Sequence, residues 1–346
     1  MTEDSNLGNN LQSDELQGEN KLSFEIQPIN SETLFVKKIT DNVREEMQKV
    51  IIGQSDLIEN MIVGLFSGGH ILLEGVPGVA KTLLVKLMAK TINVDFKRIQ
   101  FTPDLMPSDV VGTTVFNMKT SDFYFRPGPV FSNFILVDEI NRAPAKTQAA
   151  LFEVMEEHQI TIDGETHILG FPLFIVATQN PIEQEGTYKL PEAQLDRFIF
   201  KLNVNYPELS QELSILQRFK EDFDGKVTAE VKPVFNVEDL KKCIEIIEKV
   251  QIKDELLEYI AKLVCETRNS GDLFLGASPR ASLAIMKASK AKAAIKGRDF
   301  VTPDDIKNIL YSVLNHRIIM NPEREIEGVE ISDVINNIIH KIEVPR

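Results

Sequence analysis

The feature that most constrains this chain is a glycine-rich loop at residues 75–82, placed between two apolar runs. The run 71–73 precedes it and the run 83–85 follows it, an order typical of strand, loop and helix. The N–H groups of such a loop surround a phosphate, and the start of the helix adds partial positive charge. The sequence therefore predicts a phosphate-binding loop. Its members are Gly75, Val76, Pro77, Gly78, Val79, Ala80, Lys81 and Thr82.

Two residues of the loop, Lys81 and Thr82, carry groups that a bound nucleotide needs. A lysine in this place reaches the β- and γ-phosphates, and the neighbouring hydroxyl is a ligand for Mg²⁺. Ala80 stands where the common pattern G-x-x-x-x-G-K-[ST] has its second glycine, and alanine adopts a positive φ less readily. The alternative is an ordinary Gly/Pro turn between a strand and a helix, and the motifs further along the chain argue against it.

A pair of carboxylates, Asp138 and Glu139, follows the apolar run 134–137. Asp138 is expected to hold Mg²⁺ through its water shell, and Glu139 to polarise the attacking water of a hydrolysis reaction. The alternative is that the two side chains cap the next helix. Downstream of a phosphate-binding loop, the hydrolytic interpretation is favoured.

Two further polar residues, Asn180 and Arg197, stand at strand boundaries. Asn180 is placed to contact both a γ-phosphate and the attacking water, or to form an Asx turn before Pro181. Arg197 comes just before the last strand, where a guanidinium group would stabilise charge on the transferred phosphoryl group, as an arginine finger does. The alternative for Arg197 is a surface salt bridge with Asp196.

Short apolar strands alternate with helical segments between residues 71 and 200, which indicates a parallel sheet covered by helices. Ligands bind such sheets beyond the carboxyl ends of the strands, where the loop, Asp138 and Asn180 all fall. The predicted strands are 71–73, 97–101, 134–137, 173–177 and 198–202. Helical patterns alone follow Tyr206-Pro207. They cover 210–223, 237–250, 253–266, 280–296, 303–315 and 331–339.

Two segments interrupt the alternation. Residues 158–169 predict a hairpin, because Asp163-Gly164 separates two alternating runs. Residues 112–131 contain a cluster of aromatic side chains followed by a Gly128-Pro129 turn. The cluster comprises Phe116, Phe123, Tyr124 and Phe125.

Composition narrows the class of protein. The chain has 346 residues and a net charge of −14, and residues 1–33 carry seven acidic residues against one basic residue. We expect residues 1–32 to form a disordered acidic tail. An acidic chain of this kind argues against nucleic acid as a partner. No apolar run is long enough to cross a bilayer and no secretory signal opens the chain, so we expect a cytoplasmic protein that is not integral to a membrane.

None of the five histidines falls in a metal-ligand spacing, and each is expected to be an ordinary polar or surface residue. They are His70, His158, His167, His316 and His340. No metal is predicted beyond Mg²⁺ bound with the nucleotide.

Taken together, the phosphate loop, the carboxylate pair, Asn180 and Arg197 resemble an AAA+ ATPase, and several longer strings resemble the MoxR family. Those strings are 75–82, 100–109, 138–144, 177–183, 190–198 and 276–281. The resemblance runs from about residue 35 to the region near residue 318. The family tolerates alanine at position 80, and Lys189 stands where the family would have proline.

The resemblance implies a fold with two parts: an α/β P-loop domain over 33–205 and an all-α lid over 206–346. It implies that Lys81 with Thr82 is the Walker A pair and Asp138 with Glu139 the Walker B pair. The segment 112–131 corresponds to the family's helix-2 insert, and the hairpin 158–169 to its pre-sensor insert. Both would face the central pore of a ring; the alternative is that their aromatic side chains pack between subunits.

The remaining roles come from the same resemblance. Asn180 corresponds to sensor 1, and Arg197 to the arginine finger that acts on a neighbouring subunit. Arg280 corresponds to sensor 2, acting within its own subunit or across the interface. Its alternative is a solvent-exposed arginine at a helix start. The adenine pocket is expected to be lined by Ile51, Ile52 and Gly53.

The function implied is ATP hydrolysis by a ring, expected to be hexameric, that remodels or matures client proteins together with a partner carrying a von Willebrand factor A (VWA) domain. ATP, ADP and Mg²⁺ are the implied cofactors. Three alternatives stay open: a nucleotide-gated scaffold with little turnover, a motor acting on nucleic acid, and a chelatase-type subunit. Acidic residues in the hairpin 158–169, Asp163 and Glu165, argue against the second.

Overall fold

A five-stranded parallel sheet lies at the centre of the molecule. The computed structural model describes residues 31–75, 80–180, 188–220 and 230–345. The strand order is β2-β5-β8-β1-β9, and every neighbouring pair is parallel. The five strands expected from the sequence are therefore confirmed. Their bounds are β1 (His70–Gly75), β2 (Phe96–Gln100), β5 (Phe134–Asp138), β8 (Phe174–Gln179) and β9 (Phe198–Val204).

The three inner strands of this sheet, β5, β8 and β1, are apolar without alternation and are buried on both faces. On β1, Ile71 and Leu73 contribute to one hydrophobic core and Leu72 to another. The first core includes side chains from α1 (Ser31–Gln48), α2 (Ser55–Phe66) and α3 (Lys81–Ile92), and the second includes side chains from α5 (Ala145–Glu157). Continuous apolar strands of this kind are typical of parallel sheets covered on both sides.

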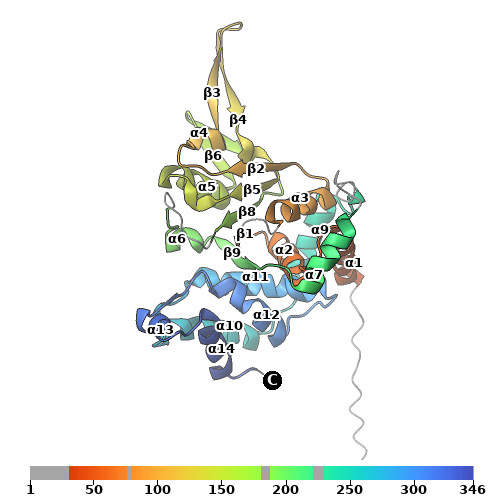
Figure 1. The fold of residues 1–346 in the computed structure, drawn as a ribbon, viewed down its shortest axis with the longest axis vertical. Coiled ribbons are helices and arrows are strands. Elements are labelled where there is room, and N and C mark those ends of the chain that lie inside the picture. The colour runs from red at the N-terminus through yellow and green to blue at the C-terminus, as the bar shows by residue number, and fades with distance from the viewer. Residues whose placement is uncertain (1–30, 76–79, 181–187, 221–229, 346) are drawn as a thin grey trace, which may run out of the picture.

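Two hairpins extend the α/β part. The predicted hairpin is confirmed as β6 (Gln159–Ile162) and β7 (Glu165–Ile168). A second hairpin, formed by β3 (Gly112–Asn117) and β4 (Asp122–Pro127), projects far from the sheet (Figure 1). The sequence marked this segment only as an insert. Three short helical turns lie nearby. They are α4 (Pro107–Val111), η1 (Pro129–Phe131) and η2 (Ile140–Arg142).

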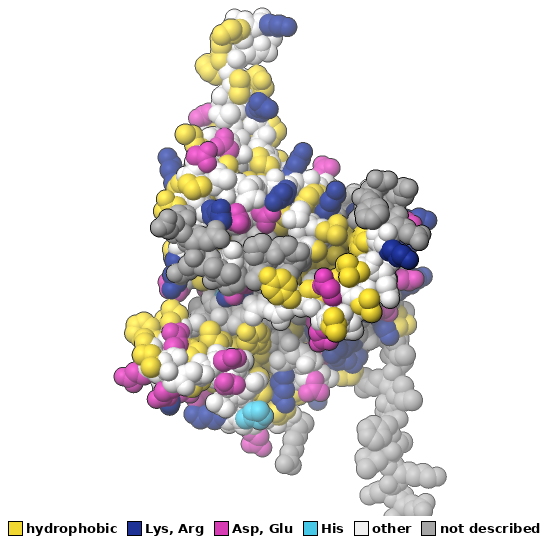
Figure 2. Space-filling view, viewed as in Figure 1, with side chains coloured by type: hydrophobic (Ala, Val, Ile, Leu, Met, Phe, Trp, Pro, Cys, Tyr) yellow, Lys and Arg dark blue, Asp and Glu magenta, His cyan; other side chains and the backbone are white. Residues whose placement is uncertain are grey.

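The aromatic side chains of the insert divide into two groups. Near the tip of the β3–β4 hairpin, Phe116 and Phe123 contact each other at 5.0 Å between ring centroids and are largely exposed. At its base, Phe125 stacks on His167 of the second hairpin at 4.2 Å. The tip rings are therefore the ones free to meet another molecule, and Figure 2 shows hydrophobic side chains at this end.

The lid is helical and lies at the opposite end of the molecule from the β3–β4 hairpin (Figure 1). The first hydrophobic core continues into it, and α11 packs against α1 and α2. A short antiparallel pair, β10 (Leu273–Leu275) with β11 (Ile319–Met320), adds to the all-α arrangement expected from the sequence. The lid helices are α9 (Val237–Glu248), α10 (Asp254–Asn269), α11 (Pro279–Ile295), α12 (Pro303–Leu314), α13 (Pro322–Ile326) and α14 (Ile331–Lys341).

The short helix α6 (Glu192–Leu195) lies between β8 and β9, and α7 (Leu209–Phe219) follows β9 on the way to the lid. The predicted tail lies outside the described residues, except that Ser31 and Glu32 form the start of α1. The boundary proposed at residues 205 and 206 stays a prediction. Among the described residues, no helix combines the length and apolar character needed to cross a membrane.

Candidate functional site

A pocket of about 480 Å³ opens at the carboxyl ends of β1, β5 and β8. It brings together polar side chains that lie far apart in the sequence, as expected for an open parallel sheet. The predicted site residues in its wall are Gly75, Ala80, Lys81, Thr82, Asp138, Glu139 and Asn180. The middle of the loop, Val76, Pro77, Gly78 and Val79, lies outside the described residues.

The loop meets α3 at Ala80 and Lys81. Ala80 adopts φ 57° and ψ 21°, the left-handed conformation that usually favours glycine. Lys81 begins the helix, and its Nζ donates a hydrogen bond to the Gly75 carbonyl at 2.6 Å. Burial lowers the pKa of Lys81, and the nearby carboxylates of Asp138 and Glu139 oppose that shift. The ammonium group thus faces the carboxylate pair across the pocket.

Thr178 on β8 binds the carboxylate of Asp138 and the backbone of Glu139. Its hydroxyl donates to Asp138 Oδ1 at 2.7 Å and accepts from the Glu139 N–H at 3.0 Å. Glu139 has φ 56°, an uncommon conformation for a residue with a side chain. Neither carboxylate caps a helix: Glu139 precedes η2 without a side-chain cap bond, and α5 begins after Pro144. The capping alternative is therefore wrong.

Two residues of β2 that the sequence reasoning missed also contact the carboxylates. Arg98 forms an ion pair with Asp138 at 2.7 Å, and the Gln100 amide donates to Glu139 Oε2 at 2.7 Å. Their sequence signal is that two polar side chains stand two residues apart on the predicted strand 97–101. Side chains two residues apart on a strand point to the same face.

The oxygen donors of the pocket fit a magnesium ion. Mg²⁺ prefers hard oxygen ligands and keeps several of its waters, so one hydroxyl and one carboxylate are enough protein ligands. Thr82 and Asp138 supply them, and both line the pocket. Asn180 lines the same pocket from the end of β8.

The residues predicted to hold adenine lie elsewhere. Gly53 lines a second cavity, of about 580 Å³, whereas Ile51 is buried in the core. The other wall of this cavity includes the segment 203–208 and Gln211 of α7. The two cavities are neighbours, because Gly75 of the first pairs with Val204 of the second in the β1–β9 ladder.

Arg197 and Arg280 lie together in a third cavity, of about 240 Å³. Both bind Glu156 of α5: Arg197 Nη1 contacts Glu156 Oε2, and Arg280 Nη2 contacts Glu156 Oε1 at 2.6 Å. Burial, and then the neighbouring Arg280, lower the pKa of Arg197. Within the described residues, this cavity shares no lining residue with the pocket around Lys81.

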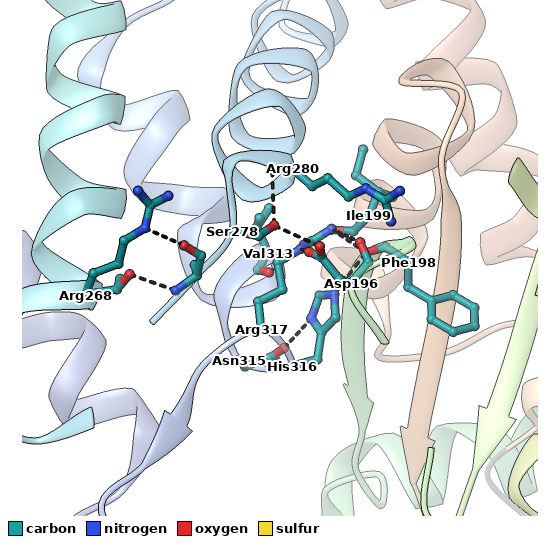
Figure 3. A network of polar contacts seen from close by, with 12 residues as sticks. Asp196, Phe198, Ile199, Arg268, Ser278, Arg280, Val313, Asn315, His316 and Arg317 are labelled. Carbon is teal, nitrogen blue, oxygen red and sulfur yellow. Dashed lines mark hydrogen bonds and ion pairs between the residues drawn. The ribbon is translucent and has the colours of Figure 1, made fainter. Parts of the chain in front are cut away.

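The sequence alternative for Arg197, a salt bridge with Asp196, is wrong. Asp196 instead pairs with the buried Arg317 at 2.8 Å (Figure 3). The expectation that His70 and His316 are ordinary polar or surface residues is also wrong. Both are buried, and their ring nitrogens are satisfied by backbone groups of the sheet: His70 accepts from Ile175 N–H, and His316 Nε2 binds the Phe198 carbonyl.

A nucleotide-binding α/β domain with a helical lid is the class of protein that this fold and site define. The AAA family model ("ATPase family associated with various cellular activities") matches residues 70–200, and the AAA lid domain model matches residues 265–338. A solved structure of a provisionally assigned ATPase from Cytophaga hutchinsonii superposes with a TM-score of 0.84 at 43% identity, covering 91% of this chain and 97% of that one.

Two relatives are similar over most of their length. The uncharacterized protein YeaC of Bacillus subtilis is 45% identical, over 87% of this chain and 93% of its own. Chaperone MoxR1 of Mycobacterium tuberculosis is 42% identical, over 87% of this chain and 81% of its own. The chain belongs to the MoxR family of AAA+ ATPases.

Proposed function

We propose that this protein hydrolyses ATP in the pocket around Lys81. The observation that carries the proposal is the convergence of an ammonium, a hydroxyl, two carboxylates and an amide at the carboxyl ends of three neighbouring strands. In this proposal Lys81 binds the β- and γ-phosphates. Glu139 takes the proton of the attacking water, and Asn180 orients that water and the γ-phosphate.

Thr82 and Asp138 would hold Mg²⁺, which supplies charge neutralisation on the phosphates when bound. The base would lie in the neighbouring cavity beside Gly53, which Ile52 precedes in the chain. Gly75 lines the phosphate pocket and pairs with Val204, which lines this cavity. The contact of Gln211 with the Gly53 carbonyl at 3.5 Å supports α7 as the second wall of that cavity.

We infer that Arg197 and Arg280 act on the nucleotide of a neighbouring subunit. Both lie away from the pocket of their own chain, and their cavity is cationic. It is lined by four basic side chains, those of Arg197, Arg280, Lys287 and Arg317, and by two acidic ones, those of Glu156 and Asp196. An excess of positive charge suits a phosphate group. A closed ring would complete the site of every subunit with residues of the next one, and we propose a hexamer.

The work done by hydrolysis is proposed to be the remodelling or maturation of client proteins. The name of the chaperone relative supports this class of activity. The exposed rings of Phe116 and Phe123 on the projecting hairpin are suited to contact a client. A VWA-domain partner and a cytoplasmic location stay predictions from the family resemblance.

The experiment that tests the proposal compares ATP turnover of the wild-type chain with that of Glu139→Gln, with nucleotide affinity measured in parallel. We expect turnover to fall by about 100-fold or more while ATP still binds, since the general base alone is removed. Turnover at the wild-type rate would refute the role of Glu139. Binding without turnover in the wild-type chain would favour the nucleotide-gated scaffold.

A further inference from the structure

The end of α12 closes the outer edge of the central sheet. β9 is an edge strand, so some of its carbonyl groups have no partner strand. Three consecutive lid residues bind them. Asn315 donates to the Lys201 carbonyl at 3.1 Å, and His316 Nε2 binds the Phe198 carbonyl at 2.9 Å. Arg317 is the third (Figure 3). Lid and sheet are thereby joined through backbone groups.

Arg317 is the centre of this junction. Its guanidinium uses all five of its N–H donors, and the residue is only 8% exposed. Nε donates to Asp196 Oδ1 at 2.8 Å. The other acceptors are backbone carbonyls: Ile199 at 3.1 Å and Val313 at 2.6 Å from Nη1, and Asp196 at 3.0 Å and Phe198 at 2.6 Å from Nη2. Lysine, a point charge with three donors, cannot reproduce this fork.

The second oxygen of Asp196 reaches a different lid helix. Asp196 Oδ2 accepts from the Ser278 hydroxyl at 2.8 Å, and the same hydroxyl accepts from the Arg280 N–H at 3.1 Å. Ser278 is the N-cap of α11. One carboxylate therefore fixes the start of the helix that carries Arg280, and it belongs to the residue next to Arg197.

The loop before Ser278 is held equally firmly. Ala277 donates its N–H to Thr267 Oγ1 at 2.9 Å and accepts from Arg268 Nε at 2.8 Å (Figure 3). At Gly276 a side chain would meet the backbone of Arg268 at 2.7 Å, so the loop lies directly on α10. The start of α11 therefore cannot shift without disturbing both α10 and β9.

We propose that Asp196 and Arg317 are positioning residues that hold Arg197 and Arg280 as one rigid pair for the nucleotide of the neighbouring subunit. This rests on the proposed ATPase function. Both arginines have long, partly exposed side chains, with 28% and 49% of the side chain accessible. Such side chains act at a defined distance only when their backbones are fixed, because small displacements at a reacting centre reduce the rate strongly.

The test uses full-length Arg317→Lys and Asp196→Asn proteins, with turnover, KM for ATP and the unfolding temperature measured for each. We expect kcat to fall about tenfold or more and KM to stay within about twofold, because the pocket around Lys81 is untouched. Mixing either variant with Glu139→Gln should restore part of the turnover. In such a mixture, Arg317→Lys or Asp196→Asn subunits provide an intact pocket around Lys81. Neighbouring Glu139→Gln subunits provide correctly positioned Arg197 and Arg280.

Arg197→Ala removes an arginine that is proposed to act on the neighbouring subunit, so it tests directly whether subunits complement each other. It should also recover turnover when mixed with Glu139→Gln. No turnover in the wild-type chain, or no recovery in this reference mixture, would refute the proposed function rather than the positioning role. The matched control is Arg298→Lys, which weakens an ion pair inside the lid, with the buried Asp305 at 2.7 Å. It should lower the unfolding temperature without changing kcat per folded chain.

Wild-type turnover in Arg317→Lys and Asp196→Asn would overturn the positioning role. So would a loss of turnover that Glu139→Gln does not rescue, because the junction would then serve stability alone. If Arg317→Lys does not fold, turnover of Asp196→Asn and its rescue by Glu139→Gln test the proposal instead. Asp196→Asn is the milder change, because asparagine keeps one oxygen that can accept from Arg317. Failure of both to fold would also count against the proposal.

Discussion

Arg98 in the middle of β2 forms an ion pair of 2.7 Å with Asp138 at the end of the neighbouring strand β5. The same carboxylate accepts the Thr178 hydroxyl through its other oxygen. The group that we propose to hold Mg²⁺ is therefore bound on both sides by protein donors. A metal ion with its water shell would have to compete with Arg98 for Oδ2.

Arg98→Ala should lower the Mg²⁺ concentration that half-saturates ATP turnover, because the competing cation is removed. The Arg98 side chain is 50% exposed, so the pair is worth at most about 1 kcal/mol, which corresponds to a shift of about fivefold. Magnesium titrations at saturating ATP measure it. Lys97→Ala, one residue earlier on the same strand, is the control and should leave the titration unchanged. An unchanged or raised midpoint in Arg98→Ala would contradict the competition.

Ala80→Gly should be tolerated or stabilising, because Ala80 has φ 57°. The left-handed conformation costs an alanine about 1 kcal/mol, and the greater freedom of glycine in the unfolded chain offsets part of that gain. We expect the free energy of unfolding to rise by about 0–1 kcal/mol, with ATP affinity retained. The same substitution at Ala89, buried within α3, is the control and should destabilise by about 1 kcal/mol. Equal destabilisation at both positions would contradict the left-handed conformation.

Much of the nucleotide pocket was predictable from sequence, because strand ends in a parallel sheet meet at one edge. The positions of Lys81, Asp138 and Asn180 in one pocket follow from that rule alone. Arg98 and Gln100 reach the pocket because their strand, β2, is the spatial neighbour of β5. The sequence gives no direct indication of strand order, so the pairing of β2 with β5 had to be observed.

The contact of Arg197 and Arg280 with Glu156 could not be predicted from the sequence. Glu156, Arg197 and Arg280 come from α5, the start of β9 and a lid helix. Their proximity depends on how the lid packs, which no local pattern encodes. Local alternatives failed for the same reason: Asp196 adjoins Arg197 in sequence, but Arg317, 121 residues away, binds it. The β3–β4 hairpin was missed because its turn, unlike Asp163-Gly164, carries no strong hairpin signal.

Gly75→Ala should destabilise the protein and weaken ATP binding. A Cβ at this position would lie 2.5 Å from the Val204 carbonyl oxygen, which belongs to the paired backbone of β9. Overpacking against backbone costs about 1–3 kcal/mol and would displace the carbonyl that binds Lys81. Denaturant unfolding and nucleotide titration measure the two effects. Gly271→Ala, which has no atom within 4 Å of the added Cβ, is the control. If Gly75→Ala lowers the free energy of unfolding as little as Gly271→Ala does, Gly75 is not closely packed against Val204.

His70 at the start of β1 is buried between β8 and α5. Its Nδ1 accepts from Ile175 N–H at 3.1 Å and its Nε2 donates to the Met155 carbonyl at 3.2 Å. Burial lowers the pKa of His70 to about 4, and the His158 ring, with its centroid 6.1 Å away, acts in the same direction. In the unfolded chain the pKa is about 6.5. The folded state therefore binds fewer protons between these values.

It follows that the stability due to neutral His70 is fully present above pH ~6.5 and is lost as the pH falls towards about 4. The full loss is about 3 kcal/mol, since each pKa unit corresponds to about 1.4 kcal/mol. Carboxylates with lowered pKa values, such as Asp305, also make the free energy of unfolding fall as the pH falls. The contribution of His70 is therefore measured as the difference in pH dependence between the wild-type chain and a His70 variant. His70→Gln should flatten the loss of unfolding free energy between pH 7 and pH 5, measured by denaturant titration. His340→Gln changes an exposed histidine and is the control, which should keep the wild-type loss. If His70→Gln loses as much unfolding free energy between pH 7 and pH 5 as the wild-type chain, His70 is not the source of that loss.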